Sequence, residues 1–138
     1  MKSWAWIVAC MVAVMVFQPG AALADEAKGL LDGMTFFGQV CAKGKAEGDL
    51  DVFTFKDGRF YSLACDKDGF GDAAYTATNE GGFIVFKAEM HSSSGTITWQ
   101  GRATKNSVDG SMVFRRKTTW YNFVLPSAEE KIFTAKSK

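Results

Sequence analysis

Histidine, cysteine and proline are scarce in this chain of 138 residues, which contains one His, three Cys and two Pro. A zinc site needs more His or free Cys side chains than the chain offers. The C-x-x-C pairs of redox and haem-attachment motifs are absent, and so is the G-x-S-x-G turn that carries the nucleophile of many hydrolases. We therefore predict a protein that is not an enzyme and that uses no cofactor.

An excess of charge of one sign is also lacking. Lys and Arg number 16 against 15 Asp and Glu, which gives a net charge of +1, so nothing indicates a nucleic acid as a partner. The chain is 47% hydrophobic and 14% aromatic, which is too apolar for a disordered protein. Its length suits a single domain.

The one long apolar run lies near the N-terminus. It extends from Trp4 to Phe17, follows the cation Lys2, and is shorter than the roughly 20 residues of a membrane-spanning helix. Ala22-Leu23-Ala24 then has the A-x-A pattern of a cleavage site. We predict that residues 1–24 are a bacterial signal peptide cleaved after Ala24. Residues 25–138 would then form one periplasmic or secreted domain without a transmembrane segment.

The three cysteines divide between the leader and the domain. Cys10 ends Ile7-Val8-Ala9-Cys10, a loose match to a lipoprotein box that offers an alternative to cleavage after Ala24, with a lipid anchor on Cys10. Cys41 and Cys65 remain in the domain. Because an exported protein meets an oxidising compartment, we predict one disulfide between them. The alternative is two buried free thiols.

Short aromatic or β-branched runs alternate with Gly-, Asp- and Ser-containing turns along the domain. The expected strands are Thr35–Cys41, Leu50–Phe55, Phe60–Ala64, Ala74–Ala77, Phe83–Met90, Thr96–Ala103, Ser111–Arg116 and Tyr121–Leu125. This pattern predicts an all-β fold. Short connections favour an antiparallel meander, and closing about eight strands into a barrel removes the sheet edges. Ser127 is expected to cap a short C-terminal helix, the alternative being a frayed terminus.

The clearest hairpin surrounds Asp57-Gly58, a pair that suits a two-residue type I′ turn. That turn pairs Lys56 with Arg59 and Phe55 with Phe60, so that the two Phe side chains share one face.

Phenylalanine is abundant, with 12 residues in the chain. An eight-stranded barrel is wide enough either for packed side chains or for one small ligand, and the sequence leaves both open. The run Phe83–Phe86 is continuously apolar, so we expect that strand to be covered on both faces. Six aromatic residues are predicted in the interior as candidate ligand contacts: Phe53, Phe55, Phe60, Phe83, Phe86 and Trp99.

A second group of residues is predicted on the surface, where it would contact a partner such as an envelope protein. Its members are His91, Ser94, Gly95, Arg115, Arg116 and Trp120. We interpret His91 as a residue of the polar loop His91–Gly95. The basic cluster Arg115–Lys117 is expected to protect the end of an edge strand, with binding of an anionic or sugar group as the alternative.

Three carboxylates, those of Asp66, Asp68 and Asp72, lie within seven residues. They are a weak candidate calcium site, because their spacing differs from that of the EF-hand loop. We prefer the interpretation as a glycine-rich turn with solvated carboxylates, and we predict no metal.

A signal peptide followed by a meander of about eight short strands resembles the lipocalin-like (calycin-type) barrels of bacterial secreted proteins. The resemblance covers residues 31–125 and is architectural. Gly33-Met34-Thr35-Phe36 stands where true lipocalins carry Gly-x-Trp. The Gly-x-Trp motif is not met, and the resemblance implies a barrel without assigning a role to any residue. The expectation that this barrel binds a small apolar or amphipathic ligand comes from its aromatic content.

A second resemblance is to small periplasmic lysozyme inhibitors, which are β-barrels that insert a Ser-Gly loop into the lysozyme cleft. Ser94-Gly95, followed by Trp99-Gln100-Gly101, is similar to that loop, although Ile97 and Thr98 stand near the place of its tyrosine. We therefore expect a non-enzymatic ligand-binding barrel, with a protein-binding module such as a lysozyme inhibitor or envelope adaptor as the alternative. The sequence does not predict the oligomeric state.

Overall fold

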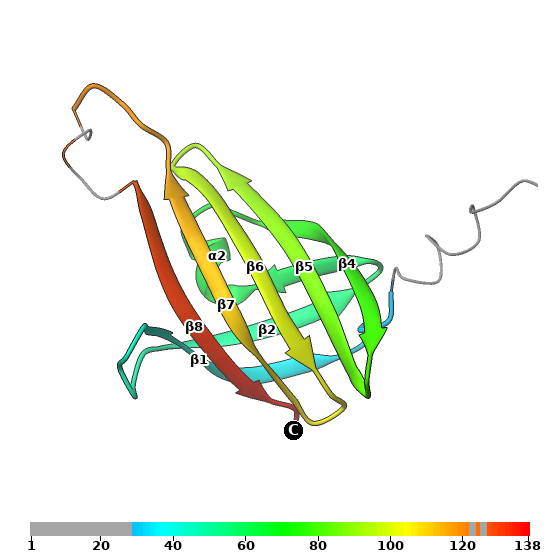
Figure 1. Cartoon of the computed structure of the whole chain (residues 1–138). Coiled ribbons are helices and arrows are strands. Elements are labelled where there is room, and N and C mark those ends of the chain that lie inside the picture. Colours follow the sequence, from blue (N-terminus) through cyan, green and yellow to red (C-terminus); the bar gives the residue numbers. More distant parts are fainter. Residues whose placement is uncertain (1–28, 122–123, 125–126) are drawn as a thin grey trace, which may run out of the picture.

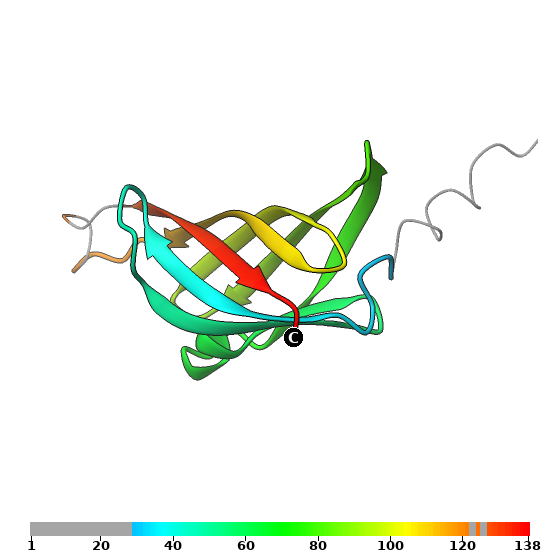
Figure 2. The same cartoon turned by 90° about the horizontal axis from the view of Figure 1, so that it is seen from below.

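The computed structural model describes residues 29–121, 124 and 127–138, and within them eight antiparallel strands close into a barrel (Figure 1). The strands are β1 (Thr35–Ala42), β2 (Asp49–Lys56), β3 (Arg59–Ser62), β4 (Asp72–Glu80), β5 (Phe83–Ser92), β6 (Gly95–Ala103), β7 (Ser107–Arg116) and β8 (Ala128–Lys136). Each strand pairs with the next, and β8 returns to pair with β1, as Figure 2 shows from below. The predicted all-β meander barrel is confirmed. The predicted leader, with Cys10, lies outside the described residues.

The Asp57-Gly58 hairpin has the predicted register. Lys56 pairs with Arg59 and Phe55 pairs with Phe60. Asp57 and Gly58 have φ angles of 52° and 72°, the two positive values that a type I′ turn requires. Both Phe side chains are buried inside the barrel.

Interlocked aromatic rings fill the middle of the barrel. The indole of Trp99 lies 5.5 Å from the ring of Phe53 and 5.2 Å from those of Phe60 and Phe133, measured between centroids. Phe55 packs edge-on against Phe86 at 5.0 Å. These are the distances and tilts that aromatic pairs prefer. The middle of the barrel is therefore packed.

Phe83 corrects one interior prediction. Its side chain is 40% exposed and lies under the guanidinium of Arg102, 5.1 Å from the ring centroid. Successive residues of a strand face opposite sides, and Phe86 and Ala88 take the inward positions of β5. Phe83 thus faces outward, and β5 is covered on its inner face alone.

The end of β3 also differs from the prediction. The strand expected over Phe60–Ala64 ends at Ser62, and α2 (Leu63–Lys67) follows it. Ser62 ends the strand because its hydroxyl accepts a hydrogen bond from the N–H of Cys65 at 3.2 Å, which caps the helix.

The C-terminal helix prediction is wrong, because Ala128–Lys136 forms β8. This strand pairs with β7 on one side and β1 on the other, and the pairing that closes the barrel outweighs the local helix signal. The strand expected over Tyr121–Leu125 is wrong where the structure describes it, since Tyr121 and Val124 lie in turns.

A short segment before β1 closes one end of the barrel. Leu31 is fully buried there, and its N–H donates to the hydroxyl of Tyr75 at 3.1 Å. That hydroxyl in turn donates to the carboxylate of Asp32 at 2.6 Å. Burial and the hydrogen bond to Asp32 both raise the pKa of Tyr75, so the phenol stays protonated. Its two hydrogen bonds then hold the segment with Leu31 and Asp32 at the barrel end.

Helices play little part in this architecture. Among the described residues, no helix combines the length and apolar character needed to cross a membrane.

Candidate functional site

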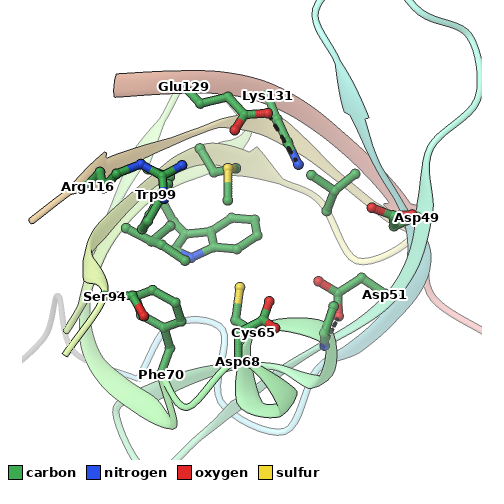
Figure 3. A pocket seen from close by; sticks show the side chains of 15 residues that line it. Asp49, Asp51, Cys65, Asp68, Phe70, Ser94, Trp99, Arg116, Glu129 and Lys131 are labelled. Atoms are coloured by element: carbon green, nitrogen blue, oxygen red, sulfur yellow. Dashed lines mark hydrogen bonds and ion pairs between the residues drawn. The ribbon is translucent and has the colours of Figure 1, made fainter. Parts of the chain in front are cut away.

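The opposite end of the barrel holds a pocket of about 390 Å³ (Figure 3). Pockets that bind small molecules have volumes in this range. The lining residues come from inward-facing positions near this end and from α2 and the loops beside it. They are Val40, Asp49, Asp51, Ala64, Cys65, Asp68, Phe70, Ser94, Ile97, Trp99, Met112, Phe114, Arg116, Glu129 and Lys131.

The floor of the pocket is apolar. The fully buried Trp99 lies across it, where the packed aromatic core ends. Phe70 and Phe114 form an edge-on pair at 6.1 Å on one side, and Ile97 and Met112 complete the surface. An apolar group of a ligand would lose contact with water here.

The rim carries charges of both signs. Lys131 pairs with Glu129 at 3.6 Å between Nζ and Oε1, and this pair borders one side of the pocket in Figure 3. The guanidinium of Arg116 lies 5.5 Å from the ring centroid of Phe114. Asp49 and Asp68 are exposed on the other sides. An apolar floor under a polar rim is the arrangement that suits an amphipathic molecule.

Two buried N–H groups of the pocket lack acceptors. Nε1 of Trp99 and Nε of Arg116 have no hydrogen-bond partner in the part of the chain that the structure describes. In Figure 3 the indole of Trp99 lies across the middle of the pocket and Arg116 lies at its upper left. Because a buried donor without a partner is costly, each of the two N–H groups favours an acceptor from outside the described residues.

Asp51 fixes the position of α2 beside the pocket. Its side chain is buried and accepts hydrogen bonds from the Ser62 hydroxyl at 2.5 Å, the N–H of Val52 at 2.7 Å and the N–H of Ala64 at 3.0 Å. A carboxylate with three such donors is well satisfied. Asp51 therefore connects β2, β3 and α2, and it holds Cys65 at the pocket wall.

The predicted disulfide is absent from the structure, where Cys41 and Cys65 are buried free thiols. Cys65 belongs to the core cluster inside the barrel and points into the pocket in Figure 3. Cys41 lies outside that cluster, because the inward positions of β1 belong to Phe36 and Val40. The wall of the barrel separates the two side chains, which explains why they are not bonded.

Burial raises the pKa of the Cys65 thiol to about 11. In the unfolded chain the thiol ionises at lower pH, so the folded state binds more protons between about pH 9 and 11. Stability therefore falls with rising pH in this window. We expect a loss of about 2–3 kcal/mol in the free energy of unfolding. Urea unfolding of the wild type and of Cys65→Ala at increasing pH measures it.

The alanine variant removes the thiol but leaves the tyrosines, so the difference between the two proteins isolates Cys65. This difference should shrink by the stated amount as the pH rises. Parallel curves for the two proteins would show that the thiol has an ordinary pKa.

The three carboxylates of the candidate calcium site do not converge. Asp66 accepts from the hydroxyl of Tyr61 at 3.0 Å, and Asp72 pairs with Arg59 at 2.9 Å. Asp68 borders the pocket. Within residues 29–121, 124 and 127–138, no three Asp, Glu, His or Cys side chains lie close enough together to hold a metal ion.

The predicted loop around His91 is shorter than expected. His91 belongs to β5 and lies on its outer face, with Nε2 3.1 Å from Glu89 and Nδ1 3.3 Å from the hydroxyl of Thr96. Ser94 lies in the turn and borders the pocket. Gly95 begins β6, and a Cβ atom there would lie 2.1 Å from the carbonyl oxygen of Arg115. The structure thus divides this group between the outer wall and the pocket mouth.

The basic cluster does not protect a sheet edge, because β7 is paired on both sides. Arg115 is exposed on the outside, whereas Arg116 lines the pocket. Trp120 lies beyond the end of β7 and is 87% exposed. Successive side chains of a strand point to opposite faces, so Arg115 and Arg116 lie on different sides of the barrel wall.

Of the six interior aromatics expected to contact a ligand, Trp99 alone lines this pocket, while Phe53, Phe55, Phe60 and Phe86 are buried in the packed core below it. Sequence reasoning missed Asp51, Met112, Glu129 and Lys131. These residues have polar or flexible side chains at positions that face the barrel interior. The sequence alone does not show that they face inward, because the strand register decides it.

A second, larger depression of about 840 Å³ is lined by residues of β7, β8, β1, β2 and α2. Phe37, Leu50 and Leu63 give it exposed apolar surface. It contains neither of the unpaired buried N–H groups that mark the pocket at the barrel end. We therefore place the candidate site at the barrel end.

This site combines an apolar floor, a charged rim and two buried N–H groups that have no partner among the described residues. A scan against protein-family models found no matching family, and searches of curated proteins and of solved structures found no match either.

Proposed function

We propose that the protein is a non-enzymatic carrier or receptor that binds one small amphipathic ligand in the pocket at the barrel end. The observation that carries the proposal is the pocket itself, which lies at one end of an otherwise packed barrel and has an apolar floor and two buried N–H groups without a partner among the described residues. The apolar part of the ligand packs against Trp99, Phe70 and Met112. Its polar end lies at the rim.

The polar end of the ligand is a hydrogen-bond acceptor, and an anionic group fits best. Arg116 at the rim supplies a positive charge and an Nε–H donor without a partner among the described residues. Of the four carboxylates that line the pocket, Glu129 pairs with Lys131 and Asp51 accepts three hydrogen bonds, while Asp49 and Asp68 are exposed on other sides of the rim than Arg116. A carboxylate at Arg116 forms a charge-assisted hydrogen bond.

The pocket lacks the features of a nucleophilic site. The raised pKa of Cys65 keeps its thiol protonated at neutral pH, and a thiol is a poor nucleophile. His91, the only histidine, lies on the outer wall. Binding without catalysis is the function that this chemistry supports.

We also propose that the protein works in the periplasm or outside the cell. The support is the sequence of the leader, with its apolar run and the A-x-A pattern before Asp25.

Arg116→Gln is expected to weaken the binding of decanoate at least about tenfold, because it removes a charged hydrogen bond. Decanol, which has the same chain length and no charge, should lose much less affinity. Isothermal titration calorimetry with the two ligands measures this. Arg115→Gln is the matched control, because it removes the same charge one residue away on the outer surface.

Two variants, each with one alanine replaced by phenylalanine, test where the ligand binds. Ala64→Phe fills the pocket and should abolish binding of both ligands, whereas Ala74→Phe adds the same bulk on the exposed outer face of β4 and should not. Wild-type protein that binds neither ligand, or binding that survives Ala64→Phe, would contradict the proposed function.

A further inference from the structure

The connection between β7 and β8 presents large apolar side chains to solvent. Trp120 is 87% exposed, Tyr121 is 70% exposed and Val124 is 77% exposed. The rings of Trp120 and Tyr121 contact each other edge-on at 5.7 Å. In Figure 1 the described residues that follow β7, drawn in orange, extend beyond the barrel end. Exposed side chains of this size usually mark a contact surface.

The side chains at the base of the connection are positively charged. Arg115 and Lys117 are exposed, and Arg116 lies between them. The two nearest carboxylates of β8 lie close to cations of their own, Glu129 to Lys131 at 3.6 Å and Glu130 to Lys43 at 3.7 Å. An anionic surface that meets this end lies near the exposed cations Arg115 and Lys117.

We propose that Trp120, Tyr121 and Val124, with Arg115 and Lys117 at their base, dock the barrel end onto a lipid bilayer that contains anionic lipids. Trp and Tyr rings are favoured at the boundary between headgroups and acyl chains, where a ring can be buried while its polar atom stays hydrated. Basic residues beside an apolar tip add attraction to anionic headgroups.

A bilayer suits this tip better than a protein partner does. A stable protein interface covers about 800 Å² on each side and centres on well-packed pockets. The described part of the connection offers three large exposed apolar side chains, which are few for the core of such an interface. It can enter a fluid interface that rearranges around it, where a few aromatic anchors suffice.

Docking of this kind would turn the pocket toward the membrane. Arg116, the last residue of β7, and Glu129, near the start of β8, both line the pocket, and the connection joins these two strands. The docking proposal stands on the exposed tip and its charges, and it remains testable even if the pocket binds nothing.

Co-sedimentation with vesicles tests the proposal. We expect the wild type to bind vesicles of phosphatidylcholine mixed with phosphatidylglycerol, and to bind vesicles of phosphatidylcholine alone more weakly. Trp120→Ser should lower the partition coefficient about tenfold, because it removes a large apolar surface that becomes buried when the protein docks on the bilayer. Phe83→Ser is the matched control, since it removes an exposed aromatic ring from the outer wall and should leave binding unchanged. All variants carry the same N-terminus, so any contribution of the leader is common to them.

Fluorescence gives an independent reading of the same event. Of the four Trp residues of the chain, Trp99 is fully buried and Trp4 and Trp6 are common to all variants, so the difference in blue shift between the wild type and Trp120→Ser on vesicle addition reports Trp120. Phe83→Ser should show the full shift of the wild type, and Trp120→Ser should show a smaller one. Equal binding of the wild type and Trp120→Ser, or a wild type that binds no vesicles, would overturn the proposal and favour a protein partner for this tip.

Discussion

Replacing Trp99 by alanine is expected to lower the free energy of unfolding by about 3–5 kcal/mol. Trp99 is fully buried and contacts three rings of the core, those of Phe53, Phe60 and Phe133. Alanine leaves a cavity in the middle of the barrel that these rings cannot fill without leaving their own contacts. The loss is a large part of the 5–15 kcal/mol that stabilises a typical domain. Urea unfolding followed by circular dichroism measures it.

Trp120→Ala is the matched control for this prediction. It makes the same chemical change at a side chain that is 87% exposed, so stability should change by about 0.5 kcal/mol or less. Similar losses in the two variants would mean that Trp99 does not occupy the core described here.

Asp51→Ala should cost roughly 2–4 kcal/mol, because three donors lose a charged acceptor together. These donors are the Ser62 hydroxyl and the N–H groups of Val52 and Ala64. Since they belong to β2, β3 and α2, the loss also frees the helix that forms one wall of the pocket. We expect weaker decanoate binding to accompany the loss of stability.

Asp49→Ala is the control for Asp51→Ala, because Asp49 faces the same side of β2 but is exposed. Its effect on unfolding should stay within about 0.5 kcal/mol. Asp51→Asn, which keeps one acceptor oxygen, should lie between the two. Equal stability of all three variants and the wild type would contradict the buried network.

Much of the fold follows from the sequence, because apolar and polar residues alternate along a strand that has one face in the core and the other in solvent. The Asp57-Gly58 hairpin was predictable down to its register, since local turn chemistry determines the pairing. The closed meander follows from short connections between short strands. Phe83 was assigned to the wrong side, because an apolar run does not reveal which residues point inward until the neighbouring strand fixes the register.

The pocket could not be predicted in the same way, and the reason lies in β8. Its inward positions include Glu129 and Lys131 at the pocket and Phe133 in the core. The charged residues that form the rim interrupt the apolar alternation that identifies a strand. Sequence rules fail here because these inward positions line a pocket rather than the packed core. Asp51 was missed because a carboxylate that is buried by hydrogen bonds within the protein looks, in the sequence, like an exposed one.

The central claim is that the pocket at the barrel end holds a small amphipathic ligand. Comparing the native and the denatured mass of protein isolated from its source without detergent tests this claim most directly. We predict a native species that is heavier and releases one small molecule on denaturation. The denatured chain should begin at Asp25. Equal native and denatured masses, for protein that also fails to take up added decanoate, would contradict the account.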